Sequence, residues 1–423
     1  MLTVLTSAKT VRNQTKRSVS PGRHEKQMNE EARRLGAHRS VIRELFEYAR
    51  AKKAEEGAGA IHDFTLGNPS VPPPAEVTAA LLRAIETTEP TVLHGYTTAA
   101  GDPAVRAAVA KDLAARCGAK VDPDLLYLTV GAAAALSATF GAILTPGDEA
   151  IVIAPYFPEY RVFLSHAGAT VREVAAKAPD FSLDLDAIRE AITEKTALLL
   201  YNSPNNPTGA VVSREELAAL SDLLRKKERE FGHPIYLVAD EPYRELVYDG
   251  LEVPSPLAFY DDTVICYSFS KSLSLPGERI GYVLISPKAT DARALYDGVA
   301  GAARALGYVC APSLFQKILP ACLGKVSSLE TYDKNRKTLY RALVSYGFSP
   351  VYPRGAFYLF LKSPEPDANR FLARAKEHGI LFVPSDSFGV GGYVRIAYCV
   401  GEKEIEDSLP AFRALAKDYG LTD

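Results

Sequence analysis

The sequence predicts an α/β fold in which a mostly parallel central sheet, flanked by helices, is joined to a smaller α+β domain. Between about residue 105 and residue 281, short apolar runs with little polar alternation follow one another, with helical stretches between several of them. Such runs are typical of strands buried on both faces, and crossover helices are what parallel neighbours require. The 423 residues, 47% of them hydrophobic, suffice for two or three packed domains.

Apolar runs mark the expected strands of the central sheet. They are Leu126–Val130, Ala150–Ile153, Ala197–Tyr201, Ile235–Ala239, Thr263–Phe269 and Gly281–Ile285. Helical spacing of apolar residues predicts helices over Met28–Glu56, Ala75–Ile85, Pro287 to about Leu323, and Ser327–Ser345. Towards the end of the chain, expected strands at Ala356–Leu361 and Tyr393–Ala397 alternate with expected helices at Ala368–His378 and Glu402–Lys417. This change of pattern indicates a second, smaller domain.

These patterns divide the chain into four parts. We expect a large domain over residues 65–325, a small α+β domain over residues 326–423, and an N-terminal helix and arm over residues 28–64 that packs against the small domain. Residues 1–27 carry basic residues and no acid before Glu25, and we expect a disordered extension there, ahead of a second methionine at Met28. A mitochondrial-type transit peptide fits this composition weakly.

Composition and charge exclude several classes of function. Lys and Arg number 49 against 51 for Asp and Glu, which gives no electrostatic argument for nucleic acid or an anionic membrane as a partner. The uncharged run Leu125–Gly147 is broken by glycine and proline, and we expect a strand and a buried helix there rather than a membrane span. The five scattered cysteines and the histidine spacing predict reduced thiols in a cytoplasmic protein and no metal site.

Lys271 is the most informative residue of the chain. It directly follows an apolar strand-like run, the hydroxyls of Ser268 and Ser270 precede it, and Arg279 follows in a glycine-flanked turn. An amine can bond covalently to an aldehyde cofactor, hydroxyls can donate to its phosphate, and a guanidinium can grip phosphate with two hydrogen bonds. This window resembles the pyridoxal-phosphate lysine signature of class I/II aminotransferases.

The resemblance extends to the residues expected around the cofactor ring. Asp240 ends an apolar strand, where a carboxylate paired with the ring nitrogen would keep that nitrogen protonated. Tyr243, three residues later, and Asn206, in an Asn-Pro-Thr-Gly segment, match the residues that bond the cofactor's phenolic oxygen in the family. Phe157 matches the aromatic residue that stacks on the ring, where many relatives carry Trp.

A second set of positions is expected to hold the phosphate. Gly131, Ala132 and Ala133 lie between a strand and a helix, and free backbone N–H groups at a helix start suit an anion. Relatives often have Ser, Thr or Lys there, so in this chain any contact would come from the backbone. Tyr96 matches a tyrosine that reaches the phosphate of the neighbouring subunit, which implies a homodimer.

For the substrate, Arg395 is the expected clamp of the α-carboxylate. Its planar fork matches a carboxylate, and an arginine within an apolar strand needs a partner. By resemblance, the backbone of Gly67 contacts the same carboxylate, Asn206 lies beside it, and Phe357 lines the site. The matches run from Gly67 to Arg395 in the order of the family.

The resemblance implies an aspartate aminotransferase-like enzyme of fold type I with a seven-stranded sheet, in which Lys271, Asp240 and Tyr243 are the catalytic residues. It would move an amino group between an L-amino acid, with an aspartate-like donor favoured, and a 2-oxo acid. A C–S β-lyase, a ring-forming synthase or an oxidase uses the same residues, and an aromatic or aliphatic donor is the next choice. A dicarboxylate would need a second cation, for which Arg39, Arg43 and Arg354 remain open.

Two other classes of protein fit the sequence less well. A regulator with an aminotransferase-like domain needs a DNA-binding module, and the residues ahead of Met28 are too few for one. A pseudo-enzyme is disfavoured because the expected cofactor residues are present together. They are Lys271, Asp240, Asn206, Tyr243 and Arg279.

Overall fold

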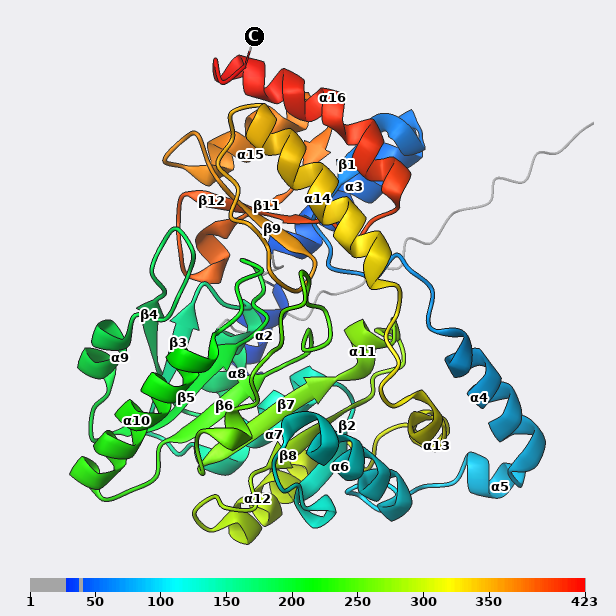
Figure 1. The fold of residues 1–423 in the computed structure, drawn as a ribbon, viewed down its shortest axis with the longest axis vertical. Helices are drawn as coiled ribbons and strands as arrows, with labels where there is room; N and C mark the ends of the chain where they lie inside the picture. Colours follow the sequence, from blue (N-terminus) through cyan, green and yellow to red (C-terminus); the bar gives the residue numbers. More distant parts are fainter. Residues whose placement is uncertain (1–27, 38–40, 423) are drawn as a thin grey trace, which may run out of the picture.

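The computed structural model describes residues 28–37 and 41–422, and it consists of a large lower body and a small upper body (Figure 1). The expected extension over residues 1–27 lies outside the described residues. In the described parts of the chain, no helix is long and apolar enough to cross a membrane.

A seven-stranded sheet forms the centre of the large body, in the order β2-β8-β7-β6-β5-β3-β4 (Figure 1). Its strands are β2 (Leu126–Thr129), β3 (Glu149–Ala154), β4 (Thr170–Ala175), β5 (Thr196–Asn202), β6 (Tyr236–Asp240), β7 (Thr263–Ser268) and β8 (Gly281–Ile285). The pairs from β4 to β7 are parallel, whereas β8 runs antiparallel to both of its neighbours. The predicted α/β fold with a mostly parallel sheet is confirmed.

Strand β4 is the one strand of this sheet that the apolar runs do not reveal. It lies at the edge of the sheet and pairs only with β3 among the described residues. Most of its residues are exposed, and Arg172 pairs with Glu149 of β3. A strand with one free edge needs no continuous apolar run, and charged residues there discourage pairing with other chains.

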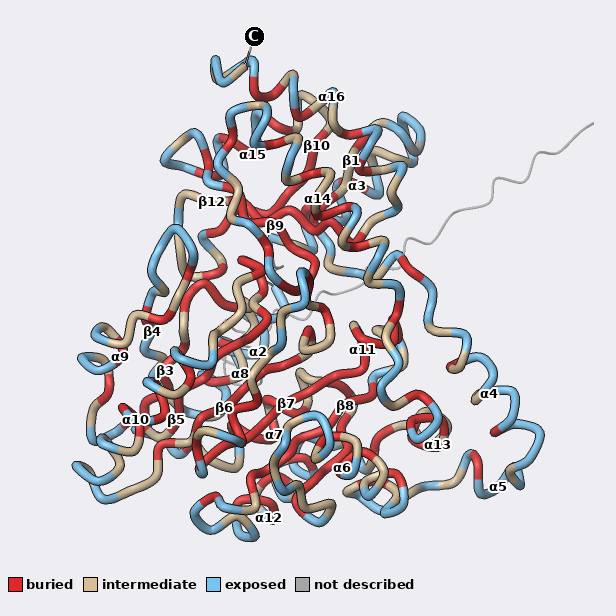
Figure 2. The backbone as a smooth tube through the Cα atoms, viewed as in Figure 1, coloured by how far each residue is buried: buried red, intermediate tan, exposed pale blue. Residues whose placement is uncertain are grey.

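Helices cover both faces of the sheet. On one face lie α6 (Pro103–Cys117), α9 (Leu185–Ala191), α10 (Arg214–Phe231) and α13 (Ser313–Cys322), with α4 (Ala75–Thr87) and α5 (Pro90–Leu93) beyond them. On the other face lie α7 (Ala132–Ile143), α8 (Glu159–His166) and α12 (Ala292–Ala305). Alternate residues of each strand enter the two apolar cores, which appear as a buried centre in Figure 2.

The predicted helical stretch from Pro287 to Leu323 is two helices. Between α12 and α13 the chain turns at Gly307, which has a φ of 86°, and at Pro312. A left-handed glycine ends a helix and a proline disfavours helical conformation in the residue before it, so the pattern of apolar residues continues across a break in the backbone. Similarly, Phe269 begins the short helix α11 (Phe269–Ser272) rather than ending β7.

The small body is an antiparallel sheet of β11 (Val383–Pro384), β12 (Tyr393–Ala397) and β9 (Tyr358–Lys362), covered by α14 (Leu329–Ser345), α15 (Ala368–Glu377) and α16 (Glu402–Asp418). From the N-terminal region come α2 (Glu30–Ala37) and α3 (Val41–Glu56). The strand β1 (His62–Asp63) pairs in parallel with β10 (Ile380–Leu381). Leu45 and Ala49 of α3 and Phe64 after β1 share an apolar core with the small body.

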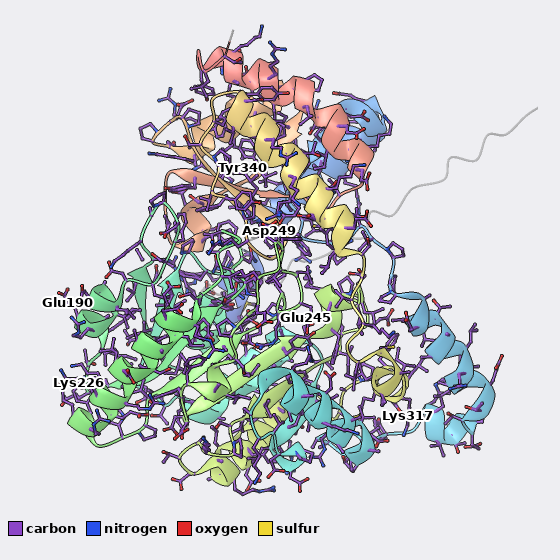
Figure 3. All side chains as sticks on the ribbon, in the orientation of Figure 1. Glu190, Lys226, Glu245, Asp249, Lys317 and Tyr340 are labelled. Carbon is purple, nitrogen blue, oxygen red and sulfur yellow. The ribbon has the colours of Figure 1, made fainter. Side chains whose placement is uncertain are left out.

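A buried ion pair ties the two bodies together. Arg336 of α14 is wholly buried and makes two hydrogen bonds of 2.9 Å to the carboxylate of Asp249, which is labelled in Figure 3. It also bonds Asp333 one turn earlier, and its guanidinium lies over the ring of Tyr248. Every nitrogen of this guanidinium therefore has a hydrogen-bond partner.

Candidate active site

Most of the predicted site residues line one cavity of about 280 Å³. It lies at the carboxyl ends of β5, β6 and β7, the strand ends that face the small body in Figure 1. In a parallel sheet this is the edge where ligand groups gather. The predicted residues that line it are Gly67, Ala132, Ala133, Phe157, Asn206, Asp240, Tyr243, Ser268, Ser270, Lys271, Arg279 and Arg395. Positions that span most of the chain therefore share one cavity.

Lys271 lies on the short helix α11 directly after β7, and its amine points into the cavity. Its Nζ donates a hydrogen bond of 2.7 Å to the carbonyl oxygen of Gly67 and lies 5.4 Å from the centre of the Phe357 ring. Burial lowers the pKa of Lys271 to about 8, and the nearby cations Arg395 and Arg279 add to this effect. A neutral amine is thus accessible near physiological pH, as a nucleophilic lysine requires.

Asp240 ends β6, and its two carboxylate oxygens differ in their surroundings. The hydroxyl of Tyr160 donates a hydrogen bond to Oδ2, whereas Oδ1 is buried without a hydrogen-bond partner among the described residues. Burial raises the pKa of Asp240 to about 7, although the hydrogen bond from Tyr160 opposes the rise. A buried acceptor without a donor is costly, so Oδ1 fits a ligand that brings an N–H group.

At one end of the cavity, several hydrogen-bond donors converge. Gly131 has a φ of 90° and precedes α7, and a Cβ on it would lie 2.6 Å from the Nη2 of Arg279. The hydroxyls of Ser268 and Ser270 are 2.6 Å apart, and Arg279 Nη1 lies 3.5 Å from the latter. The first N–H groups of α7 have no acceptor within the helix. This end of the cavity fits an anion such as phosphate.

At the other end lies Arg395, on β12 of the small body and almost wholly buried. Its Nη1 donates to Asn206 Oδ1 at 3.1 Å and its Nη2 donates to the carbonyl oxygen of Thr65 at 2.5 Å, while Nε has no partner. No carboxylate of the described residues lies within ion-pair distance of it. The guanidinium instead lies over the ring of Tyr358. A buried cation without a counter-ion fits an anionic substrate.

Some predicted residues lie elsewhere. Phe357 is wholly buried and contacts the rings of Tyr243 and Tyr358 rather than lining the cavity; its neighbour Tyr358 lines it instead. The rings of Phe357 and Tyr358 lie 5.0 Å apart and both contact Tyr243, but it is Tyr358 that lines the cavity. Tyr96 is 89% exposed and does not line the cavity within one chain.

Of the three arginines considered for a second carboxylate, Arg39 lies outside the described residues, and neither Arg43 nor Arg354 lines the cavity. Arg354 instead lines a larger cavity of about 600 Å³. That larger cavity is not lined by Lys271, Asp240, Arg279 or Arg395, although it shares Asn202 with the smaller one. The chemistry therefore belongs to the smaller cavity.

Several residues in or beside the site were not predicted from the sequence. Tyr358 bonds the hydroxyl of Tyr243 at 2.9 Å, and a Cβ on Gly67 would collide with its hydroxyl at 2.0 Å. Asn202 ends β5, bonding the backbone of both Asp240 and Asn206. The others are Tyr160 of α8 and Ile42 of α3. Only Asn202 carried a signal, since it is a polar residue at a strand end.

The peptide bond between Asn206 and Pro207 is cis, which the sequence could not show. No group of three or more potential metal ligands occurs within the described ranges.

An amine with a lowered pKa, an unpaired carboxylate oxygen, an anion site and a buried guanidinium without a carboxylate partner fit a site for an anionic cofactor and an anionic substrate. Residues 60–412 match the family described as aminotransferase class I and II. The chain belongs to this family and is a transaminase, as the sequence predicted. Enzymes of this family generally depend on pyridoxal phosphate.

Curated relatives and solved structures agree with this assignment. The chain is 32% identical over 355 residues to a probable aspartate/prephenate aminotransferase of Thermus aquaticus, covering 82% of this chain and 90% of that one. A solved amino transferase from Eubacterium rectale is 49% identical, with a TM-score of 0.91 and coverage of 93% and 99%. The aspartate aminotransferase of Thermus thermophilus, solved with maleate, is 30% identical, with a TM-score of 0.80 and coverage of 90% and 98%.

Proposed function

We propose that this transaminase binds pyridoxal phosphate in the cavity of Lys271 and uses it to exchange amino groups between an L-amino acid and a 2-oxo acid. The observation that carries the proposal is that two buried polar atoms without partners, Asp240 Oδ1 and Arg395 Nε, belong to residues that line one cavity with Lys271. One fits the ring nitrogen and the other fits the substrate carboxylate. When bound, the cofactor supplies a ring that withdraws electrons from the substrate's α-carbon.

The residues divide into three groups by their chemistry. Ser268, Ser270, Arg279 and the backbone of Gly131, Ala132 and Ala133 hold the phosphate. Asp240 pairs with the ring nitrogen, Tyr243 and Asn206 bond the phenolic oxygen, and Phe157 stacks on the ring. Lys271 would bond the aldehyde of the cofactor, and its Nζ, when free, would take the proton from the α-carbon of the substrate, a task for which a pKa of about 8 is suited.

The α-carboxylate of the substrate binds between Arg395 and the backbone of Gly67, with Asn206 holding the guanidinium in place. Aspartate is the first donor to test, because curated relatives are named aspartate or aspartate/prephenate aminotransferase. A planar guanidinium held by Asn206 and Thr65 is preorganised, so little side-chain entropy is lost when the carboxylate binds.

A donor with an apolar side chain is the second candidate, and the composition of the cavity wall favours it. The cations that line the cavity within one described chain are Lys271, Arg279 and Arg395, and all three have a task. The remaining wall includes Ile42 and Leu66, and the latter is 41% exposed. A side-chain carboxylate would therefore need a cation from outside this set, whereas an aliphatic or aromatic side chain would not.

A substrate panel tests the function. With 2-oxoglutarate as acceptor, L-aspartate, L-phenylalanine and L-leucine are supplied in turn, and glutamate formation is measured. Transfer from any donor supports the proposal, and the ranking of kcat/KM decides between the two donor classes. Release of hydrogen peroxide, or of ammonia and pyruvate, without glutamate would replace it with an oxidase or a C–S β-lyase. Lys271→Ala should abolish both turnover and the visible absorbance of bound cofactor.

We further propose a cytoplasmic homodimer in which Tyr96 reaches the phosphate site of the neighbouring subunit. Its 89% exposure, together with that of Leu82, Ile85 and Val92 nearby on α4 and α5, supports a surface covered by a second copy. The cysteines of the described chain are all free, which supports a reducing compartment. Light scattering should give twice the mass of one chain, and Tyr96→Phe should weaken cofactor binding. A monomer with full activity would contradict the proposal.

A further inference from the structure

Tyr160 of α8 makes the single side-chain hydrogen bond to the carboxylate of Asp240 among the described residues. We propose that Tyr160 is a positioning residue, which holds Asp240 in the orientation that leaves Oδ1 open to the cofactor's ring nitrogen. This inference rests on the proposed function, because it assigns a residue that acts through Asp240. Tyr160 itself does not line the cavity.

The ring of Tyr160 is held rigidly, so its hydroxyl has one direction. The residue is 1% exposed. Its ring stacks on Tyr156 with centroids 6.3 Å apart, and the ring of Phe157, a cavity-lining residue, meets it edge-on at 5.7 Å. The two aromatic contacts fix the ring on two sides. A hydroxyl whose ring cannot turn can orient its acceptor, whereas a mobile one cannot.

The other groups around Asp240 do not donate a hydrogen bond to its carboxylate. Glu241, the first residue after β6, is paired with Arg244 at 2.6 Å, and Cys266 on the neighbouring β7 lies 3.4 Å from the hydroxyl of Thr139. Asn202 bonds the backbone oxygen of Asp240 rather than the carboxylate. Tyr243 bonds Tyr358. Without the hydroxyl of Tyr160, both carboxylate oxygens would lack a donor and the side chain could rotate.

The alternative explanation is that Tyr160 only fills space beneath the cavity. The two explanations differ in the part of the residue that matters, because packing depends on the ring and positioning depends on the hydroxyl. Tyr156 provides a matched control on the preceding loop. It is equally buried and stacks on Tyr160, but its hydroxyl neighbours the Arg161–Glu173 ion pair and makes no hydrogen bond to Asp240.

The experiment compares Tyr160→Phe with Tyr156→Phe and measures the dissociation constants of two probes. Pyridoxal phosphate reports the ring and the phosphate together, and inorganic phosphate, competing for the same site, reports the phosphate end alone. A hydrogen bond to a charged group contributes about 1.5–3 kcal/mol, so Tyr160→Phe should weaken pyridoxal phosphate about 10- to 100-fold. The affinity for inorganic phosphate should change less than about twofold, and Tyr156→Phe should alter neither value.

Three results would overturn the inference. Tyr160→Phe could bind pyridoxal phosphate as tightly as the parent protein, or it could lose affinity for both probes in parallel, as a merely packing role predicts. The third result concerns the double variant. If Tyr160 acts through Asp240, Tyr160→Phe should lower the affinity for pyridoxal phosphate little further in the Asp240→Asn background. Fully additive losses of affinity would show that it does not act through Asp240. If the parent protein bound inorganic phosphate but not pyridoxal phosphate, the proposed function itself would fall, whatever the variants did.

Discussion

Two arginines of the small body, Arg336 and Arg395, are almost wholly buried, yet they are partnered in opposite ways. Arg336 bonds two carboxylates, those of Asp249 and Asp333, and a backbone oxygen. Arg395 bonds an amide oxygen and a backbone oxygen, and its Nε is left without a partner. Both guanidinium groups also lie over tyrosine rings, so the surroundings differ mainly in the missing carboxylates.

The difference teaches how one chain uses the same side chain for two purposes. A buried cation is expensive unless it is paired, and Arg336 is paired within the fold, where it joins the two bodies. Arg395 has no carboxylate partner within the fold. A carboxylate that enters the cavity can therefore form an ion pair with it. Stability and ligand binding are therefore separable in this protein, and substitution of each arginine should affect only one of them.

The largest effect is expected for Arg395→Met. Loss of a bidentate partner for the α-carboxylate should lower kcat/KM about 100- to 1000-fold, since such desolvated charge pairs are worth about 2–5 kcal/mol. The free energy of unfolding of the cofactor-free protein should stay the same or rise, because an unpaired buried cation is removed. Steady-state kinetics and urea unfolding measure the two quantities. A large loss of stability with little loss of kcat/KM would contradict the assignment of Arg395 to ligand binding.

Arg336→Met should show the opposite pattern. The free energy of unfolding should fall by about 2–4 kcal/mol, less than for a fully enclosed pair because Asp249 and Asp333 are partly exposed. The kcat/KM of the folded protein should stay within about threefold. Lys337, which pairs with the same Asp333 but is 39% exposed, is the control, and Lys337→Met should cost at most about 1 kcal/mol. Equal losses for both variants would contradict the assignment.

Asp240, like Arg395, is a buried charged group that lacks a full set of partners, and its titration should affect stability. Its pKa of about 7 lies above its ordinary value of 3.8, so the protonated form favours the folded state and this stabilisation is lost as pH rises towards and through 7. In cofactor-free protein, Asp240→Asn should reduce the fall in unfolding free energy between about pH 5 and about pH 8 by roughly 2–4 kcal/mol. Unfolding curves at the two pH values provide the measurement. An unchanged pH dependence would show that Asp240 is not the group responsible.

The smallest effect links Arg395 to Lys271. Because burial and the charges of Arg395 and Arg279 lower the pKa of Lys271 to about 8, the rate of covalent attachment of pyridoxal phosphate should level off above about pH 8. Removing one cation in Arg395→Met should shift this profile to higher pH by a fraction of a unit to about one unit. Arg336→Met serves as the control and should leave the profile in place. A shift to lower pH would contradict the electrostatic explanation.

The elements that were predicted correctly from the sequence are those whose apolar pattern is set by burial on both sides. Strands β5 and β6, with the polar residues that end them, were visible because the buried run stops where the cavity begins. The exposed edge strand β4 was missed, since its free side imposes no apolar pattern. Tyr160 was missed for the opposite reason: a buried tyrosine on a helix looks like any core aromatic until its hydroxyl is seen beside Asp240.

The sequence by itself determined the α/β class, the family and the order of the chemical groups along the chain. Buried strands and local motifs can be recognised from residues that are close together in the sequence. Only the tertiary structure decided which atoms are left unpaired. Whether Asp240 Oδ1 or Arg395 Nε has a partner depends on residues far away in the chain, such as Tyr160, Asn206 and Thr65, and on the direction in which each side chain is packed. The tertiary structure also decided that Tyr358 rather than Phe357 lines the cavity, because the hydroxyl of Tyr358 bonds Tyr243 whereas the ring of Phe357 packs against Tyr243 and Tyr332.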